Sequence, residues 1–207
     1  MTILKQSAPE QTRMFTTNAL TWEPIGGAGC VLPITAILTP TPPGKVAIMH
    51  MRGTMGDSMK NSIREGATLA RHAVMERNTS DLFYKYDLTL VIPDHQDHMY
   101  DGSSAGLAAF SSVLGVMLCW ESNPQVAMTG ETSPDGTILK VGAICDKIRM
   151  AHEHDINTIF FPHDNISDEL KVLLEDTPVT AVGVKMVGDI IEFADQIEED
   201  LKEAESA

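Results

Sequence analysis

The sequence predicts one α/β domain built from mixed strands and helices, and three observations support this fold class. Segments rich in β-branched residues alternate along the chain with segments of helical periodicity, as in a sheet that is covered by helices. Neither an internal repeat nor a linker divides the chain. Its 207 residues suffice for one domain with a sizeable core.

The N-terminal half is expected to contain three strands and one helix. Residues 1–17 are expected to form a polar lead-in, and residues 39–44 (TPTPPG) a loop. Asp57 can cap a helix that runs to about Arg77. The apolar stripe of this helix consists of Met59, Ile63, Ala70 and Val74. Apolar, β-branched runs predict strands at 31–38 (VLPITAIL), 45–51 (KVAIMHM) and 86–93 (YDLTLVIP).

The C-terminal half is expected to alternate between helices and strands. No charged residue occurs from Gly102 to Trp120, and this run predicts a helix that begins at about Ser104. Strands are expected at 124–130 (PQVAMTG), 156–162 (INTIFFP) and 178–187 (PVTAVGVKMV), with a turn at 133–136 (SPDG). Helices are expected at 143–154, at 167–176 with Ser167 or Asp168 as the cap, and from about Asp189. The last helix places Ile190, Ala194, Ile197 and Leu201 on one face, and residues 202–207 are expected to be an acidic tail.

Composition narrows the classes of partner and compartment. The chain has 29 acidic and 15 basic residues, a formal net charge of −14, so neither nucleic acid nor an anionic membrane is expected to bind it. Three scattered cysteines (Cys30, Cys119 and Cys145) predict no disulfide framework or zinc knuckle and fit a reducing cytoplasm. The N-terminus lacks an apolar core of signal-peptide length. Serines and glycines dilute the chargeless run, which favours a buried helix over a membrane span.

A Gly-Ser-Ser-Ala-Gly turn, residues 102–106, precedes the chargeless helix and matches the pattern G-x-S-x-G. In a nucleophile elbow the serine lies directly between a strand and a helix, whereas about ten loop residues separate Ser104 from the preceding predicted strand. Two interpretations remain open on the pentapeptide alone. Ser104 can be a capping serine, or it can be a nucleophile beside the unpaired N–H groups of a helix N-terminus.

A nucleophilic serine needs a base, and the chain offers histidines and lysines. The candidate histidines are His95, His98, His152, His154 and His163. The segment DHQDH (94–98) has metal-ligand side chains but no periodicity that fixes them, so no metal site is expected. Lys147 lies between Ile144 and Ile148 on a predicted helix, which places it on an inward face or at a helix edge with its amine in solvent. Burial would lower its pKa and make it a usable base.

Three blocks of sequence together resemble the proteolytic domain of Lon proteases. They are YDLTLVIP with its loop into DGSSAG, then VAMTGE, and then GTILKVGAICDKIRMAHEHDINTIFFPHDN. NALTWEPIGG and GKVAIMHMRGTMGDSMKNS resemble the opening of the same domain. The resemblance covers about residues 17–200 and implies a single compact Lon-type proteolytic domain, which we place at residues 18–201.

The resemblance implies roles for seven residues. Ser104, the serine directly before Ala-Gly, would be the nucleophile, and Lys147 would be the general base. Thr129, in MTGE, would orient the lysine. Asp101, Gly102 and Ser103 would form the nucleophile loop and the oxyanion site; the family orders this loop in active or inactive forms. Glu131 would support the same block.

The chain departs from the family pattern in two stretches near these residues. The family typically has proline where Ser103 stands and lysine where Tyr100 stands. It has Gly-Leu-Lys-Glu-Lys where residues 143–147 read Ala-Ile-Cys-Asp-Lys. The serine and the lysine themselves are retained. These departures therefore bear on the resting conformation of the loop and on the substrate preference, and not on the presence of the dyad.

The resemblance implies a serine endopeptidase with a Ser-Lys dyad and no cofactor. Lon proteases carry an ATPase module, but no G-x-x-x-x-G-K-[ST] phosphate loop occurs in this chain, so we expect activity that is independent of ATP. The expected substrates are peptides, unfolded protein segments or a dedicated substrate protein, and a separate ATPase could act as a partner. The family further implies a homo-oligomer, a hexameric ring. The chain begins with Met1 and is read as a stand-alone protein, although an excised domain would look the same.

Two alternatives to this function remain. A non-catalytic Lon-like module could serve assembly, but the retention of Ser104, Lys147 and Thr129 argues against it. A Ser-His-Asp hydrolase could use one of the later histidines as its base.

Overall fold

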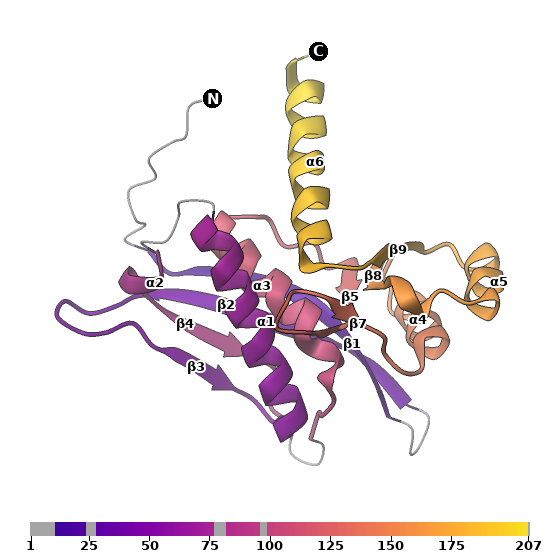
Figure 1. Ribbon diagram of the computed structural model, residues 1–207, viewed down its shortest axis with the longest axis horizontal. Coiled ribbons are helices and arrows are strands. Elements are labelled where there is room, and N and C mark those ends of the chain that lie inside the picture. Colours follow the sequence, from indigo (N-terminus) through magenta and orange to yellow (C-terminus); the bar gives the residue numbers. More distant parts are fainter. Residues whose placement is uncertain (1–10, 24–27, 77–81, 96–98, 207) are drawn as a thin grey trace.

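The computed structural model describes residues 11–23, 28–76, 82–95 and 99–206 (Figure 1). Its main sheet has seven strands in the order β3-β4-β2-β1-β5-β8-β9. The strands are β1 (Arg13–Glu23), β2 (Ala28–Pro40), β3 (Met49–Arg52), β4 (Tyr86–Val91), β5 (Val126–Met128), β8 (Thr158–Pro162) and β9 (Thr180–Val184). The pairs β1/β2 and β2/β4 are antiparallel, and all other neighbours are parallel. The predicted α/β class is therefore confirmed.

Six α-helices and two short 3₁₀-helices accompany the sheet in the described residues. The α-helices are α1 (Asp57–Glu76), α2 (Leu82–Lys85), α3 (Gly106–Leu118), α4 (Ile144–Glu153), α5 (Asp168–Asp176) and α6 (Val187–Ser206). The 3₁₀-helices are η1 (Ser103–Ala105) and η2 (His163–Asn165), and β6 (Glu131–Thr132) pairs with β7 (Ile138–Leu139) in a small hairpin. No described helix is both long and apolar enough to cross a membrane.

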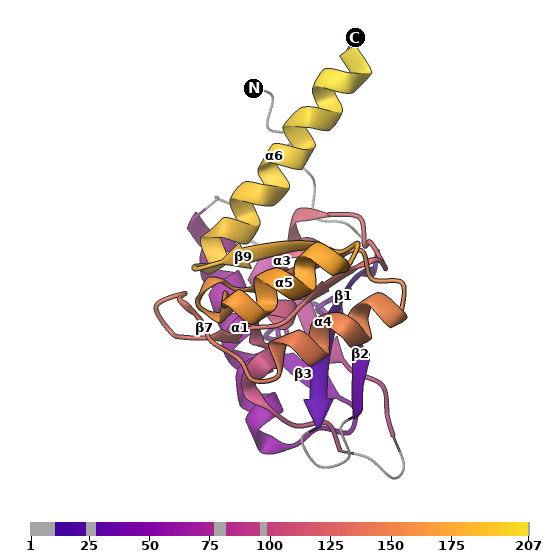
Figure 2. The ribbon, with the colours of Figure 1, turned by 90° about the vertical axis from the view of Figure 1, so that its right-hand side faces the viewer.

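Helices cover both faces of the sheet, because successive strand side chains point to opposite sides. Ala19 of β1 belongs to a core cluster with α1 and α3, whereas its neighbour Leu20 belongs to a second cluster with α4 and α5. Figure 2 shows α4 and α5 next to each other on one side of the domain. In both views α6 extends away from the rest of the domain.

The chargeless run forms the central helix, α3, as predicted. Every residue from Gly106 to Met117 is buried, which explains why the segment needs no polar face. The helix packs closely against α1, since a Cβ added at Gly66 would lie 2.3 Å from the carbonyl oxygen of Gly106. The backbones of α1 and α3 therefore approach each other at Gly106, two residues after the predicted nucleophile.

Two predicted boundaries in the N-terminal half need correction. Strand β1 begins at Arg13, inside the predicted polar lead-in, because Phe15 and Thr17 are buried and alternate with less buried neighbours. The predicted strand 45–51 is shorter: β3 begins at Met49, where pairing with β4 begins, and Val46 is 85% exposed. Residues 1–10 of the lead-in lie outside the described residues.

In the C-terminal half the predicted helices and strands are present, but several of their ends differ from the prediction. The turn at 133–136 is present and joins the unpredicted hairpin β6-β7. Ser167 caps α5 and accepts a hydrogen bond from the N–H of Leu170. The carboxylate of Asp189 accepts from the N–H groups of Lys185 and Met186, which ends β9 early and starts α6 at Val187. Helix α6 continues to Ser206 through the predicted tail, while the side chains of Ile197 and Leu201 lie outside the described ones.

Candidate active site

The side chains of Ser104, Lys147 and Thr129 meet at one point. Lys147 Nζ lies 2.9 Å from Ser104 Oγ and 2.8 Å from Thr129 Oγ1. The three residues come from η1, from α4 and from the end of β5, so they are brought together by the fold rather than by the sequence. A neutral lysine has two N–H donors and one lone pair. It can therefore donate to Thr129 and accept from Ser104 at the same time.

Backbone pairing fixes the serine relative to the threonine. The N–H of Gly130 donates to the carbonyl of Ser104 (2.9 Å), and the N–H of Leu107 donates to the carbonyl of Gly130 (3.1 Å). Thr129 is fully buried, and its own N–H donates to the carbonyl of Phe160 in β8 (3.0 Å). The turn that presents Ser104 is thus joined to the central sheet by main-chain bonds.

Lys147 points inward from α4, as its neighbours predicted. Ile144 and Ile148 are buried beside it, and the lysine itself is only 3% exposed. Burial disfavours the ammonium form and lowers the pKa of Lys147 from its ordinary 10.5 to about 8. A measurable fraction of the amine is then neutral at physiological pH, which an exposed lysine cannot offer. The alternative that the amine reaches solvent from a helix edge is therefore wrong.

The start of α4 is held by residues that sequence reasoning missed. Asn165, which is buried, accepts a hydrogen bond from the N–H of Val141 (2.9 Å) and donates to its carbonyl (2.8 Å). Ala143 lies between this anchor and the helix and adopts a left-handed conformation with φ 52°. Asn165 lies in the third of the blocks that resemble Lon domains. Its pairing with Val141 spans 24 residues, and no sequence pattern reveals such a long-range pairing.

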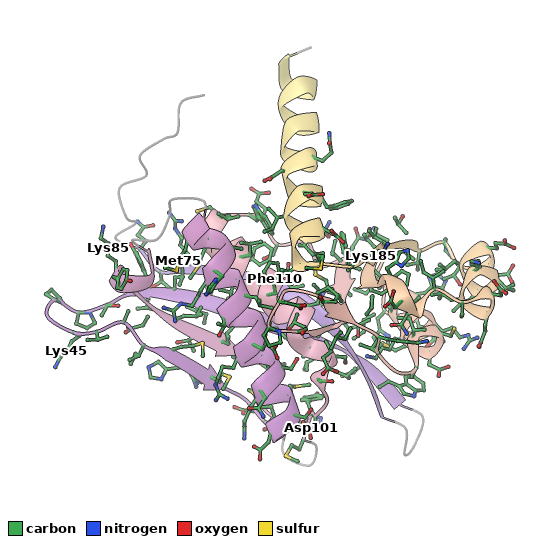
Figure 3. The ribbon with its side chains drawn as sticks, in the orientation of Figure 1. Lys45, Met75, Lys85, Asp101, Phe110 and Lys185 are labelled. Atoms are coloured by element: carbon green, nitrogen blue, oxygen red, sulfur yellow. The ribbon has the colours of Figure 1, made fainter. Side chains whose placement is uncertain are left out.

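Asp101 lies beside the start of α1 (Figure 3). Its Oδ1 accepts a hydrogen bond from the N–H of Met59 (2.9 Å), so its carboxylate occupies the N-terminus of α1, where a negative charge is favoured. Gly102 follows with φ 117° and ψ 149°, a region open almost only to glycine. Ser103 does not contact the lysine: its Oγ donates to Glu131 Oε2.

The histidines do not reach this site in the described part of the chain. His152, His154 and His163 are all exposed, and Nδ1 of His154 is paired with the carbonyl of Met150. His95 is exposed as well, and His98 lies outside the described residues. Among residues 11–23, 28–76, 82–95 and 99–206, no group of three or more His, Cys, Asp or Glu side chains could hold a metal ion.

A comparison with models of protein families identifies the family to which the chain belongs. Residues 2–201 match the model of the Lon protease (S16) C-terminal proteolytic domain. The chain belongs to the family of Lon proteolytic domains. The match covers nearly the whole chain, and it agrees with the resemblance carried by the three sequence blocks.

Full-length Lon proteases from distant organisms are similar to this Lon domain. One from Desulforamulus reducens is 30% identical over 191 residues, which are 92% of the chain and 22% of that protein. One from Chlamydia trachomatis is 33% identical over 161 residues, 77% of the chain and 19% of that protein. One from Methanosarcina barkeri is 30% identical over 179 residues, 86% of the chain and 21% of that protein. The chain thus spans about a fifth of the length of these relatives.

Proposed function

We propose that this Lon domain is a serine endopeptidase in which Ser104 and Lys147 act as a catalytic dyad. The observation that carries the proposal is the 2.9 Å separation of Lys147 Nζ from Ser104 Oγ at a lysine whose pKa is lowered to about 8. Nucleophilic catalysis requires a nucleophile and a base within hydrogen-bond reach of each other, and a third group that orients the base. Thr129 supplies the third group.

The reaction follows from these three side chains. The neutral Lys147 amine takes the hydroxyl proton as Ser104 Oγ attacks the scissile carbonyl carbon. Backbone N–H groups around Gly102 to Ser104 stabilise the oxyanion that forms. The Lys147 ammonium then returns its proton to the leaving amine, and an acyl-enzyme remains on Ser104. Water, deprotonated by the same amine, attacks the acyl carbon; the bond to Ser104 Oγ breaks, the Lys147 ammonium returns the proton to Oγ, and the carboxylic acid product leaves.

The proposed substrates are peptides and unfolded protein segments. The 207 residues contain no phosphate loop and therefore no recognisable element that could use ATP to unfold a substrate. A separate ATPase could deliver such segments, and a dedicated protein could itself be the substrate. The family further suggests a homo-oligomeric ring. The three scattered cysteines suggest a cytoplasmic protein, and the net charge of −14 suggests that it binds neither nucleic acid nor an anionic membrane.

Hydrolysis of casein by site variants tests the proposed function. We expect Ser104→Ala and Lys147→Ala each to abolish cleavage while both proteins stay folded. The double variant should be little worse than either single one, because groups that act as a unit are not additive. Abolition by Ser103→Ala and not by Ser104→Ala would contradict the assignment of the nucleophile. A wild-type protein that cleaves nothing, although it is folded, would favour an assembly module instead.

A further inference from the structure

Ser103, the residue directly before the predicted nucleophile, is held by hydrogen bonds from two different elements. Its side-chain Oγ donates to Glu131 Oε2 on β6. Its main-chain carbonyl accepts from the hydroxyl of Ser62 on α1, a serine that is only 5% exposed. Neither bond involves the amine of Lys147, which pairs with Ser104 and Thr129. The two bonds therefore act on the turn and not on the base.

The bond from Ser62 determines where one main-chain N–H points. The carbonyl of Ser103 and the N–H of Ser104 belong to the same planar, trans peptide group, in which they point in opposite directions. Because the hydroxyl of Ser62 draws the carbonyl toward α1, the N–H of Ser104 is directed away from α1. An N–H of the nucleophile itself is well placed to donate to the oxyanion that forms on the attacked carbonyl.

The bond to Glu131 restrains the other side of the same residue. Gly102 adopts φ 117° and ψ 149°, so the chain enters the turn through a conformation that only glycine adopts readily. Nothing in such a glycine limits rotation of the following peptide group, since it has no Cβ. With the Ser103 side chain bonded to β6 and its carbonyl bonded to α1, the residue cannot rotate about its own backbone without breaking one of the two bonds.

We infer that Ser62 and Glu131 are positioning residues that hold Ser103 and thereby aim the N–H of Ser104 at the oxyanion. The inference rests on the proposed function, because it assigns these side chains a part in the same reaction. Removing one oxyanion donor outright costs an enzyme about 10²–10³ in kcat. A donor that is misdirected rather than removed should cost less, so each loss is expected to lower kcat about tenfold, with KM nearly unchanged.

The first test is Ser62→Ala, with Ser111→Ala as the matched control. Ser111 is also a buried serine with a side-chain hydrogen bond, which it receives from Thr17, and it lies in α3 away from Ser103. We expect Ser62→Ala to lower kcat about tenfold and Ser111→Ala to leave it within about twofold. The midpoint of the pH–rate profile should stay the same in both variants, because Lys147 keeps its environment. Equal loss in the two variants would show a general packing effect and would overturn the inference.

The second test is a double-mutant cycle on the hydrogen bond between Ser103 and Glu131. Glu131→Ala and Ser103→Ala remove opposite ends of one hydrogen bond, so the double variant should be no slower than either single variant. Glu131→Gln keeps an acceptor oxygen in place and should recover most of the rate. Additive losses in the double variant, or no recovery with glutamine, would overturn the inference for Glu131.

Amide hydrogen exchange across residues 102–106 gives a readout that does not depend on turnover. We expect faster exchange in Ser62→Ala and Glu131→Ala than in the wild type and in Ser111→Ala, at equal global stability. Unchanged exchange would overturn the inference whatever the activity. A wild-type protein that hydrolyses no peptide would contradict the proposed function alone, and the exchange data would then decide separately whether the two side chains hold the turn.

Discussion

At the scale of single residues, Lys147 is the most unusual group in the domain. It is 3% exposed, its amine contacts two hydroxyl groups, and burial lowers its pKa to about 8. With such a pKa, about a tenth of the amine is neutral at pH 7, whereas an exposed lysine is almost wholly protonated there. The same burial that suits the amine to accept a proton must also make folding depend on pH.

The stability of the domain should therefore increase on alkalisation in a way that depends on Lys147. Its folded-state pKa, about 8, lies below the ordinary 10.5, so the unfolded chain binds more protons between these values. Stability then rises with pH across that window, and the full penalty applies below pH 8. We expect the free energy of unfolding of the wild type, relative to Lys147→Met, to rise by up to about 3 kcal/mol from pH 7 to pH 10.5. Urea denaturation at a series of pH values measures this difference.

The matched control for this prediction is Lys171→Met on α5. Lys171 has a side chain that is 61% exposed and a partner, Asp168, that is almost fully exposed. Its replacement should give a flat difference across the same pH range. A flat difference for Lys147→Met as well would mean that its amine is charged in the folded protein at neutral pH.

Ala143 is the second residue whose conformation predicts a measurable effect. It is exposed and has φ 52° and ψ 38°, in the left-handed region where a Cβ crowds the backbone. Glycine has no such penalty, although it loses more backbone freedom on folding. We expect Ala143→Gly to raise the free energy of unfolding by about 0.5–1 kcal/mol. Ala73→Gly, within α1, should lower it by a similar amount; a loss in both variants would contradict the prediction.

The sequence identifies individual residues only where a pattern or a resemblance carries them. The inward position of Lys147 follows from its isoleucine neighbours, and the pairing with Ser104 follows only from the resemblance to Lon domains. Ser62 could not be found in this way, because its partner, the carbonyl of Ser103, lies 41 residues away and carries no side-chain signal. The role of Asp101 at the start of α1 is likewise a product of tertiary structure.

At the scale of elements, prediction succeeds where burial imposes a clear period. Helix α1 begins at the predicted Asp57, and α4 differs from its prediction by one residue at each end. Strand β1 was missed because its inward residues include Thr17 as well as Phe15 and Ala19, which hides the apolar alternation. The hairpin β6-β7 is only two residues per strand and has no period to read. Short elements held by tertiary contacts are not visible in the sequence.

Asn165 links two elements, and its replacement should affect both the stability and the rate. Its side chain satisfies the buried main-chain N–H and carbonyl of Val141, next to the start of α4. An aspartate would keep the acceptor, lose the donor and place a charge against the carbonyl. We expect Asn165→Asp to lower the free energy of unfolding by about 1–3 kcal/mol. It should also lower kcat, because α4 carries Lys147.

Asn157→Asp provides the control for this change. Asn157 is exposed, and its side-chain oxygen accepts from the hydroxyl of its neighbour Thr158. Its replacement should change stability by less than about 0.5 kcal/mol. Urea denaturation and peptide hydrolysis of both variants are the measurements. A loss for Asn165→Asp no greater than for Asn157→Asp would mean that the anchor at Val141 carries little stability.

At the scale of the whole molecule, the 207 residues comprise one proteolytic domain and no recognisable ATP-binding element. The purified chain should therefore hydrolyse no ATP, and ATP should not accelerate peptide cleavage. A small disulfide-bonded protein should resist cleavage while its reduced and alkylated form is degraded, because the sequence has no phosphate loop with which to use ATP for unfolding. Phosphate release and gel assays measure the two effects. Cleavage of both forms at equal rates, or ATPase activity in a homogeneous sample, would contradict this expectation.

The central claim is that Ser104 is a nucleophile activated by the neutral amine of Lys147. The rate at which a fluorophosphonate labels the protein, measured by mass spectrometry of the intact chain and its peptides, tests this most directly. We predict one label, on Ser104, formed at a rate that rises with pH through about 8, in line with the lowered pKa of Lys147, and lost in Lys147→Ala. Labelling of Ser103 would contradict the account. So would a rate that titrates near ~6.5, as for a histidine base, or that persists without Lys147.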